Sequence, residues 1–212
     1  MIALKHIMSR SIILLIAALG LFTSKSHAGI GTSMMQTADL VGVGNWELGT
    51  QADVIFNRGG GFNVSAHGRT GILDQYLDLE LLAGAGTTNF QFGGTLKYNL
   101  LPDVDGQVGI SFLGAFSYLR DDINNITESF LLPGAAAIVS KRVEFFNGFI
   151  IPYGAFQYEF LMGPQDNSHT LSLIAGSRWE NKNLAPWAFY TEFTFGIKNS
   201  LYMFSVGASY PF

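Results

Sequence analysis

Apolar and polar residues alternate along most of this chain, from Asn45 to the last residue. In residues 46–56 the apolar side chains fall on one face of an extended strand, and Glu47, Gln51 and Asp53 fall on the other. A period of two is typical of β-strands that separate an apolar from a polar environment. About ten such stretches, separated by residues that favour turns, are predicted as strands: 46–56, 62–72, 77–85, 90–100, 108–118, 130–143, 150–162, 170–180, 187–197 and 201–212.

Two regions follow the alternation less clearly. Residues 134–138, with the sequence Gly-Ala-Ala-Ala-Ile, show no contrast between the two faces, so a short helix is the competing interpretation there. Residues 120–128 are mostly polar and are predicted as a loop. The other stretches are regular enough to predict an all-β fold.

The composition indicates that one face of these strands contacts lipid. Hydrophobic residues make up 48% of the chain and charged residues only 13%, whereas a soluble domain carries about a quarter charged residues. Beyond the N-terminal region, no apolar stretch approaches the ~18 residues of a membrane helix. Only helices and closed barrels satisfy their backbone hydrogen bonds in lipid. The sequence therefore predicts a transmembrane, antiparallel, up-and-down β-barrel of about ten strands, with eight or twelve as alternatives.

A soluble β-sandwich or a lipocalin-like barrel is the competing fold. Those proteins bury their apolar residues and leave charged residues on the outer face. Here the charged residues share a face with Gly, Ser and Thr, and the opposite face is nearly free of charge. This distribution favours the membrane barrel.

The N-terminus is predicted to be a secretory signal peptide at residues 1–28. Lys5 and Arg10 precede an apolar run from Ser11 to Phe22, and Ser26-His27-Ala28 places small residues before a cleavage site. The run is shorter than a membrane anchor requires, which disfavours that alternative. Residues 29–44 are then predicted to be a periplasmic leader, and residues 45–212 the barrel.

Charge and cysteine content exclude several functions. Removal of residues 1–28 takes away three of the twelve basic residues and none of the sixteen acids, which leaves a net charge of −7. An acidic chain without basic clusters is not expected to bind nucleic acid. The chain has no Cys, so a disulfide scaffold is excluded. With two His beyond the signal peptide, neither a metal site nor a cofactor is expected.

The inward-facing charged residues form a predicted lumen network. We expect cross-strand ion pairs between Arg69 and Glu80 or Asp78, and between Arg178 and Glu192. In the alternative, the same groups line a narrow pore. That pore would weakly favour cations, because acids outnumber bases in the network. Its members are Glu47, Asp53, Arg69, Asp78, Glu80, Lys97, Glu159, Arg178, Glu180 and Glu192.

The three Trp residues orient the predicted barrel. If the N-terminus is periplasmic, Trp46 begins an outgoing strand, Trp179 ends a returning one, and Trp187 precedes the next outgoing one. All three are then predicted to form a girdle at the periplasmic interface, where amphipathic aromatic side chains are enriched.

The last residues resemble the C-terminal signature of Gram-negative outer-membrane proteins. The chain ends in Gly-Ala-Ser-Tyr-Pro-Phe, a terminal Phe with aromatic or apolar residues at alternate positions before it. The resemblance implies an outer-membrane location, recognition by the barrel-assembly machinery, and contact with outer-membrane lipid and lipopolysaccharide. In architecture the chain is similar to the small OmpA- and OmpX-type barrels, with about two more strands. The residues that carry this assembly signal are Phe204, Val206, Gly207, Tyr210 and Phe212.

No catalytic arrangement is predicted. An omptin-like protease site could draw only on Asp166 and His169, and a deacylase-like Ser65–His67 pair would lie in mid-barrel, out of reach of substrate lipid. The predicted function is therefore non-enzymatic, either structural or a narrow, weakly cation-selective pore. A surface-binding, adhesin-like barrel and, less favoured, a barrel hydrolase are the alternatives, and no oligomeric state is predicted.

Overall fold

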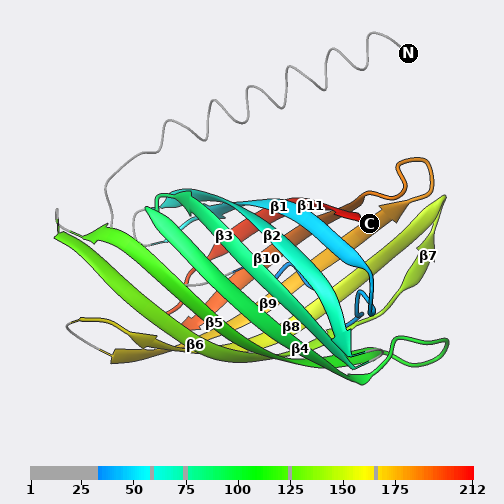
Figure 1. Cartoon of the computed structure of the whole chain (residues 1–212), viewed down its shortest axis with the longest axis horizontal. Coiled ribbons are helices and arrows are strands. Elements are labelled where there is room, and N and C mark those ends of the chain that lie inside the picture. The colour runs from blue at the N-terminus through cyan, green and yellow to red at the C-terminus, as the bar shows by residue number, and fades with distance from the viewer. Residues whose placement is uncertain (1–32, 58–59, 74–75, 124–125, 165–166) are drawn as a thin grey trace, which may run out of the picture.

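The computed structural model describes residues 33–57, 60–73, 76–123, 126–164 and 167–212 (Figure 1). The described part is built of strands, and it contains no helix long and apolar enough to cross a membrane. In chain order the strands are β1 (Trp46–Ile55), β2 (Gly61–Leu73), β3 (Leu77–Gly86), β4 (Phe90–Leu101), β5 (Gly109–Ile123), β6 (Ile126–Ser140), β7 (Val143–Phe145), β8 (Gly148–Met162), β9 (Asn167–Asn181), β10 (Ala188–Lys198) and β11 (Met203–Pro211).

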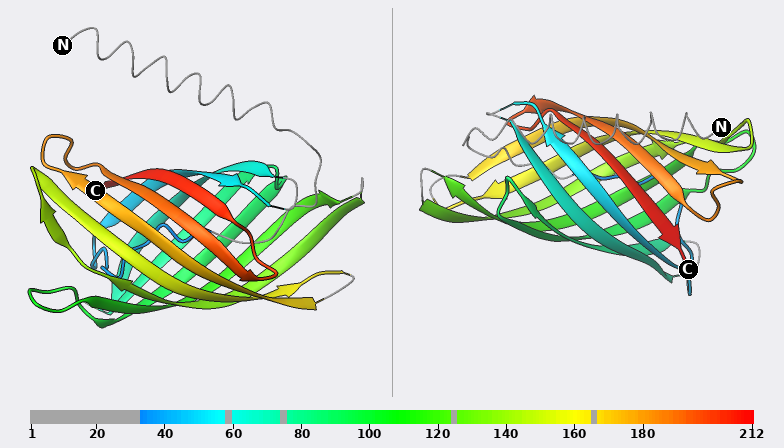
Figure 2. Two further views of the ribbon diagram at one scale, coloured as in Figure 1. Left: turned by 180° about the vertical axis from the view of Figure 1, so that it is seen from behind. Right: turned by 90° about the horizontal axis from the view of Figure 1, so that it is seen from above.

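The strands close into an antiparallel barrel. Each long strand pairs with its neighbours in the sequence, β1 pairs with β11, and β6 pairs with β8 across the short β7. Ten strands of the described chain therefore form the ring, and β7 extends the edge of β8 at one end (Figure 2). The predicted up-and-down barrel of about ten strands is confirmed. Closure leaves no unpaired sheet edge around the ring.

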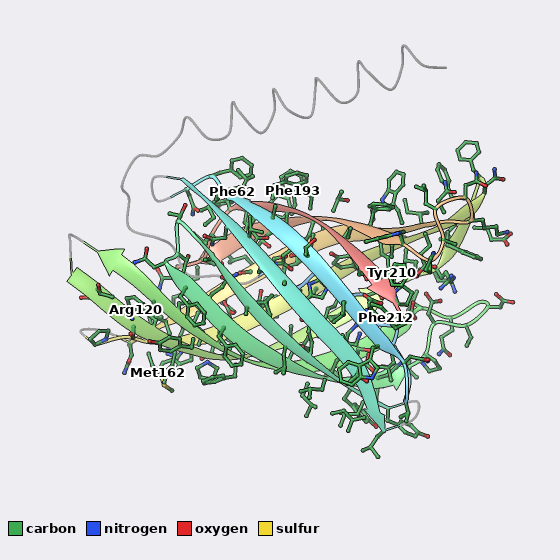
Figure 3. The ribbon with its side chains drawn as sticks, turned by 45° about the horizontal axis from the view of Figure 1, so that its top comes forward. Phe62, Arg120, Met162, Phe193, Tyr210 and Phe212 are labelled. Atoms are coloured by element: carbon green, nitrogen blue, oxygen red, sulfur yellow. The ribbon has the colours of Figure 1, made fainter. Side chains whose placement is uncertain are left out.

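Alternation along each strand sets the two faces of the wall. On β4, Phe90, Phe92 and Leu96 are exposed, whereas Gln91 and Lys97 are buried. The same alternation recurs around the ring, and Figure 3 shows Phe62 and Phe193 pointing away from the barrel. Successive side chains of a strand point to opposite faces, so the outer face is apolar and the polar residues point into the lumen.

On β6 the predicted strand is confirmed over its helical alternative, and the predicted loop at residues 120–128 is corrected. Residues 134–138 lie within β6 and pair with both β5 and β8, so the helical interpretation is wrong. Residues 120–128 are not simply a loop, because the β5–β6 hairpin continues to the pair Ile123–Ile126. Backbone pairing in a hairpin needs no apolar side chains, and polar residues can therefore extend it beyond the apolar part of the wall.

The lumen is polar on one side and apolar on the other. The inward positions of β5, β6, β8 and β9 carry large apolar side chains that the strict alternation of apolar outside and polar inside did not foresee. Two buried clusters form there, one with Leu113, Ala136, Ile138, Tyr153, Ala155 and Ile174, and one with Leu119, Phe130 and Leu132. The charged residues gather mainly on the opposite wall, on β1 to β4 and β10.

The N-terminal segment, residues 33–42, is part of the predicted leader 29–44 and lies inside the barrel. Residues 33–38 are buried, and the chain leaves the lumen through a turn at which Gly42 and Gly44 adopt positive φ angles. Glycine tolerates such angles without strain. The segment is blue in Figure 2 and runs within the ring before it joins β1. The predicted signal peptide, residues 1–28, and residues 29–32 lie outside the described residues.

Candidate functional site

The residues of the predicted lumen charge network lie on the inner face of the strands. Eight of them are each at most 7% exposed, whereas Arg178 and Glu180 are half-buried near one mouth. A buried charge is costly unless it is paired or hydrogen-bonded, so the contacts of these groups determine what the lumen can do. Most of these contacts form two sets, one around Glu47 and one around the N-terminal segment. Outside both sets, Asp53 accepts from Gln51 and Glu159 accepts from Gln157.

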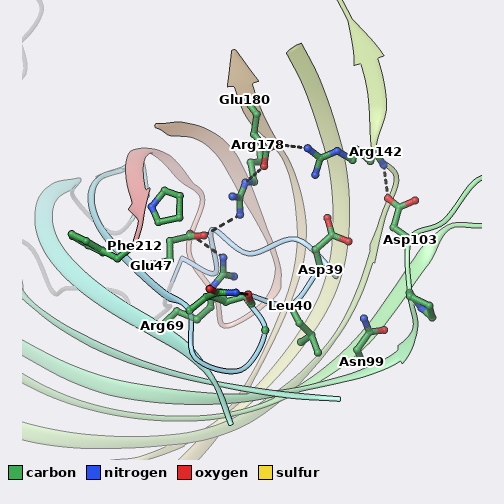
Figure 4. A pocket seen from close by; sticks show the side chains of 15 residues that line it. Asp39, Leu40, Glu47, Arg69, Asn99, Asp103, Arg142, Arg178, Glu180 and Phe212 are labelled. Atoms are coloured by element: carbon green, nitrogen blue, oxygen red, sulfur yellow. Dashed lines mark hydrogen bonds and ion pairs between the residues drawn. The ribbon is translucent and has the colours of Figure 1, made fainter. Parts of the chain in front are cut away.

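Glu47 is the centre of the first set. Its Oε1 accepts hydrogen bonds from Arg69 Nη2 and Tyr190 OH, both at 2.9 Å, and its Oε2 lies 3.3 Å from Arg178 Nη1 (Figure 4). Arg178 also pairs with Glu180, with Nε and Oε1 2.8 Å apart. Glu47 on β1 thus links β2, β9 and β10 and ties together the part of the wall where the first and last strands meet.

The ion pairs differ from those predicted. The strand register places Arg69 opposite both Glu47 and Glu80, and the ion pair forms with Glu47. The predicted pair between Arg178 and Glu192 does not form, because Arg178 lies opposite Tyr190 and Glu192 lies opposite Gly176. The alternation of apolar and polar residues identified the face on which each residue lies, but not which residue of the adjacent strand lies opposite it.

Glu192 is the first anchor of the N-terminal segment. Its Oε1 accepts from Ser33 Oγ at 2.9 Å and from the Met34 amide at 3.0 Å. Its Oε2 accepts from the Met35 amide at 2.7 Å and from Tyr153 OH at 2.8 Å. Both oxygens of this fully buried carboxylate on β10 are therefore hydrogen-bonded, and three of its four bonds go to residues 33–35.

Lys97 and Asp78 form the second anchor. Lys97 Nζ donates to the carbonyl oxygens of Thr37 at 3.1 Å and Asp39 at 2.5 Å, and it lies 3.8 Å from Asp78 Oδ2. The same Asp78 oxygen accepts from the Val41 amide at 2.8 Å. Both side chains are at most 1% exposed. The hydrogen bonds from the segment therefore offset part of the desolvation free energy of burying Lys97 and Asp78 in the wall.

Hydroxyl groups complete the contacts in the middle of the segment. The Ala38 amide donates to Ser140 Oγ at 3.0 Å, and Ser111 Oγ donates to the Ala38 carbonyl at 2.7 Å. Met34 and Ala38 pack against the apolar cluster that contains Leu113. Met35 packs against Ala188 and Tyr190. One side of the segment therefore meets polar wall residues and the other meets apolar ones.

Two glycines of the wall leave room for the segment. A Cβ at Gly71 would lie 2.2 Å from the carbonyl carbon of Gly42, where the segment enters the lumen. A Cβ at Gly207, one of the predicted assembly residues, would lie 2.8 Å from Met35 Sδ. A real Cβ atom does not come within 2.2 Å of a non-bonded atom, so a larger residue at Gly71 would clash with the segment. The shape of the barrel wall is therefore complementary to that of the segment.

A cavity of about 560 Å³ opens at the mouth near Phe212. It is lined by Glu47, Arg69 and Arg178, by Asp39 of the segment, and by Asp103, Arg142 and Glu180 (Figure 4). Arg142 Nη2 lies 2.5 Å from Glu180 Oε2, and Lys141 Nζ lies 2.8 Å from Asp103 Oδ1. Burial and the neighbouring Asp103 carboxylate raise the pKa of Asp39 above its ordinary value. The sequence analysis did not single out Asp103, Lys141 or Arg142. Asp103 lies between strands, where alternation gives no signal, and Lys141 and Arg142 fall at the end of the predicted strand 130–143, whose alternation is weak.

The predicted girdle residues, together with Tyr210 and Phe212 of the predicted assembly signal, lie on the outer face at this same mouth. Trp46, Trp179 and Trp187 are 54%, 47% and 46% exposed. The Phe212 amide donates to the Trp46 carbonyl at 2.7 Å, and the Trp187 ring packs edge-on against Tyr210 at 5.2 Å between centroids. Phe204 and Val206 continue the same outer face along β11, whereas Gly207 faces inward.

The structure does not bring the histidines together. His67 is buried in the lumen on β2, close to Gly49, and His169 is exposed on β9 beside Tyr158 and Phe160. Asp166 lies outside the described residues. Among the described residues, no group of three or more His, Asp or Glu is arranged to hold a metal ion.

Comparisons with known proteins show no family. No protein-family model matches the chain, and no curated protein matches it. Among solved structures, the chain is similar to the beta domain of the Bordetella autotransporter BrkA, with 12% identity, coverage of 81% of this chain and 100% of that chain, and a TM-score of 0.48. It is also similar to the translocator domain of the autotransporter NalP from Neisseria meningitidis, with 11% identity, coverage of 98% and 96%, and a TM-score of 0.42.

Proposed function

We propose that the chain is an integral, non-enzymatic β-barrel of a Gram-negative outer membrane, with a structural role or a narrow, weakly cation-selective passage. The observation that carries this proposal is the outer face of the closed ring. Large apolar side chains are exposed on every strand of the ring, at about half of their full area in many cases. A contiguous apolar surface of this extent is not stable in water, but it matches the hydrocarbon of a bilayer.

The location is supported by features at one mouth of the barrel. The exposed Trp residues form an interface girdle, and the terminal Phe212 carries the assembly signature. The predicted signal peptide would direct the chain out of the cytoplasm. With this mouth in the periplasm, the β5–β6 and β8–β9 hairpins end on the outer side.

The closed lumen supports a narrow passage. The N-terminal segment, the ion pairs around Glu47 and the apolar clusters together fill much of the interior. The network holds three basic and seven acidic residues, a formal net charge of −4. A confined acidic lining attracts cations and repels anions. We therefore expect little steady conductance, and any residual current should favour cations.

Fractionation, a heat-shift gel and bilayer recording on the full chain test the proposal. The protein should sediment with outer membranes and migrate faster on SDS gels before boiling than after, since a closed barrel resists detergent. In a planar bilayer it should conduct weakly, with cation preference. Recovery in the soluble periplasm would contradict the membrane barrel, and a large, steady, anion-selective current would contradict the lumen assignment.

A surface-binding role is the second candidate. The strands β5, β6, β8 and β9 each have 15 residues, and a tilted strand needs only about 9–11 to cross a bilayer. These two hairpins therefore extend beyond the apolar band on the outer side. Cell-binding assays with and without the tip of the β5–β6 hairpin distinguish this role from a purely structural one.

A further inference from the structure

Wall side chains bind the N-terminal segment mainly through the main chain of the segment. The amides of Met34, Met35, Ala38 and Val41 donate to wall side chains. The carbonyl groups of Thr37, Ala38 and Asp39 accept from wall side chains. The five wall residues responsible stand on five different strands: Asp78, Lys97, Ser111, Ser140 and Glu192.

We propose that these five residues form a binding site for a peptide main chain, and that its ligand is the chain's own segment 33–42, which acts as a displaceable plug of the lumen. The inference rests on the proposed membrane barrel. The site has the chemistry that a main chain requires, since carboxylates and a serine hydroxyl accept from N–H groups, and an ammonium and another hydroxyl donate to C=O groups. Hydrogen bonds that involve a charged partner are the stronger ones.

The barrel does not need the segment for its backbone pairing. The ring closes through β1–β11 and β6–β8. Among the described residues that precede β1, backbone pairing with the wall is one isolated bridge between Gly71 and Val43, which follows the segment. The hydrogen bonds from the segment to the wall go to wall side chains. The segment can therefore leave the lumen without breaking a strand pair, which separates a plug from a structural core element.

Departure of the segment would open the lumen to water. Glu192 would lose three of its four hydrogen bonds, and Lys97 would lose its hydrogen bonds to the two segment carbonyls. Buried charges without protein partners must be hydrated, so water has to enter. The acidic lining then provides a path for cations. The covalent link through residues 43–45 keeps the segment at a high local concentration and favours rebinding.

A disulfide trap in the full chain tests the location of the segment. The Cβ of Ala38 lies 3.2 Å from the position of a Cβ built on Gly109, and the chain has no native Cys. This separation is close to the range of disulfides. Ala38→Cys with Gly109→Cys should cross-link on mild oxidation. The control pairs Ala38→Cys with Gly114→Cys, where an added Cβ meets nothing within 4 Å, and it should not cross-link.

Bilayer recording of anchor variants tests displacement. Glu192→Gln should increase the fraction of time open by about tenfold or more over the wild type. Asp53→Asn is the matched control, because Asp53 is also a buried lumen acid but bonds Gln51 rather than the segment. In the oxidised Ala38→Cys/Gly109→Cys background the Glu192→Gln current should disappear, and reduction should restore it.

Two results would overturn the plug. One is equal conductance of Glu192→Gln and Asp53→Asn, and the other is a Glu192→Gln current that persists in the cross-linked protein. A heat-shift gel of each sample shows whether the barrel is folded. Loss of the heat shift in the wild type would instead contradict the proposed membrane barrel, so the two failures are distinguishable.

Discussion

Glu47→Gln is the substitution that most directly probes the internal ion-pair network. Gln has nearly the same shape as Glu and its amide oxygen can still accept from Tyr190 OH, so the change removes mainly the charge. The side chains of Glu47 and Arg69 are 4% and 3% exposed. Arg69 is then left as a buried cation without its ion-pair partner Glu47, whereas Arg178 keeps Glu180.

The magnitude follows from the burial of this pair. Loss of one partner of a buried ion pair costs about 3–5 kcal/mol, and we assign about 3 kcal/mol because Arg69 also lies opposite Glu80. With a urea dependence of about 1–3 kcal/mol per M, the unfolding midpoint should fall by roughly 1–3 M. Glu180→Gln is the control. Its partner Arg142 is 42% exposed, and its other partner Arg178 keeps Glu47, so the loss should stay within about 1 kcal/mol.

Urea unfolding in lipid vesicles, followed by Trp fluorescence, measures this difference. The three Trp residues lie at the interface and should report loss of the lipid environment for the whole barrel. Both variants should first show the heat shift of a folded barrel. Equal midpoints for Glu47→Gln and the wild type would refute the reasoning that Glu47 stabilises the wall as the partner of a buried arginine.

Three further predictions concern assembly and the segment. Phe212→Asp should lower outer-membrane levels far more than Phe204→Leu, because the terminal aromatic residue is proposed to be recognised; equal levels by immunoblot would contradict this. Gly71→Val should lower the Ala38–Gly109 cross-linking yield, since a Cβ there overlaps Gly42, whereas Gly114→Val should not. In the Ala38→Cys/Gly109→Cys protein, added Asp39→Asn should leave the cross-linking yield equal or higher, because burial and Asp103 raise the pKa of Asp39 and so disfavour its charge in the docked segment; a lower yield would count against that.

Alternation predicted the wall because lipid and lumen impose opposite requirements on successive residues. It worked best where the contrast is strong, as on β4, where Gln91 and Lys97 alternate with aromatic and aliphatic residues. It was weakest on β6, because Phe130, Leu132 and Ile138 point inward and both faces of that strand are apolar. The apolar side of the lumen could not be recognised from a rule that assumes a polar interior.

The contacts within the lumen were harder to predict than the faces. Pairing depends on the stagger between tilted strands, and phase alone cannot show that Arg178 lies opposite Tyr190 rather than Glu192. The N-terminal segment has no periodic signal, since its main chain rather than its side chains makes most of the polar contacts. The one indication in the sequence was the charge of Lys97 and Glu192 at inward positions, because such buried groups need hydrogen-bond partners that the barrel wall alone does not provide.

Lipid contact along one strand tests the central claim of a membrane-embedded barrel. Single Cys residues at positions 90–97 of β4 can carry a fluorophore on the full chain in vesicles with brominated lipid, because no native Cys interferes. The account predicts strong quenching at exposed positions such as Phe90, Phe92 and Leu96, and weak quenching at buried Gln91 and Lys97. Uniform quenching, or the opposite alternation, would contradict a barrel whose apolar face meets lipid.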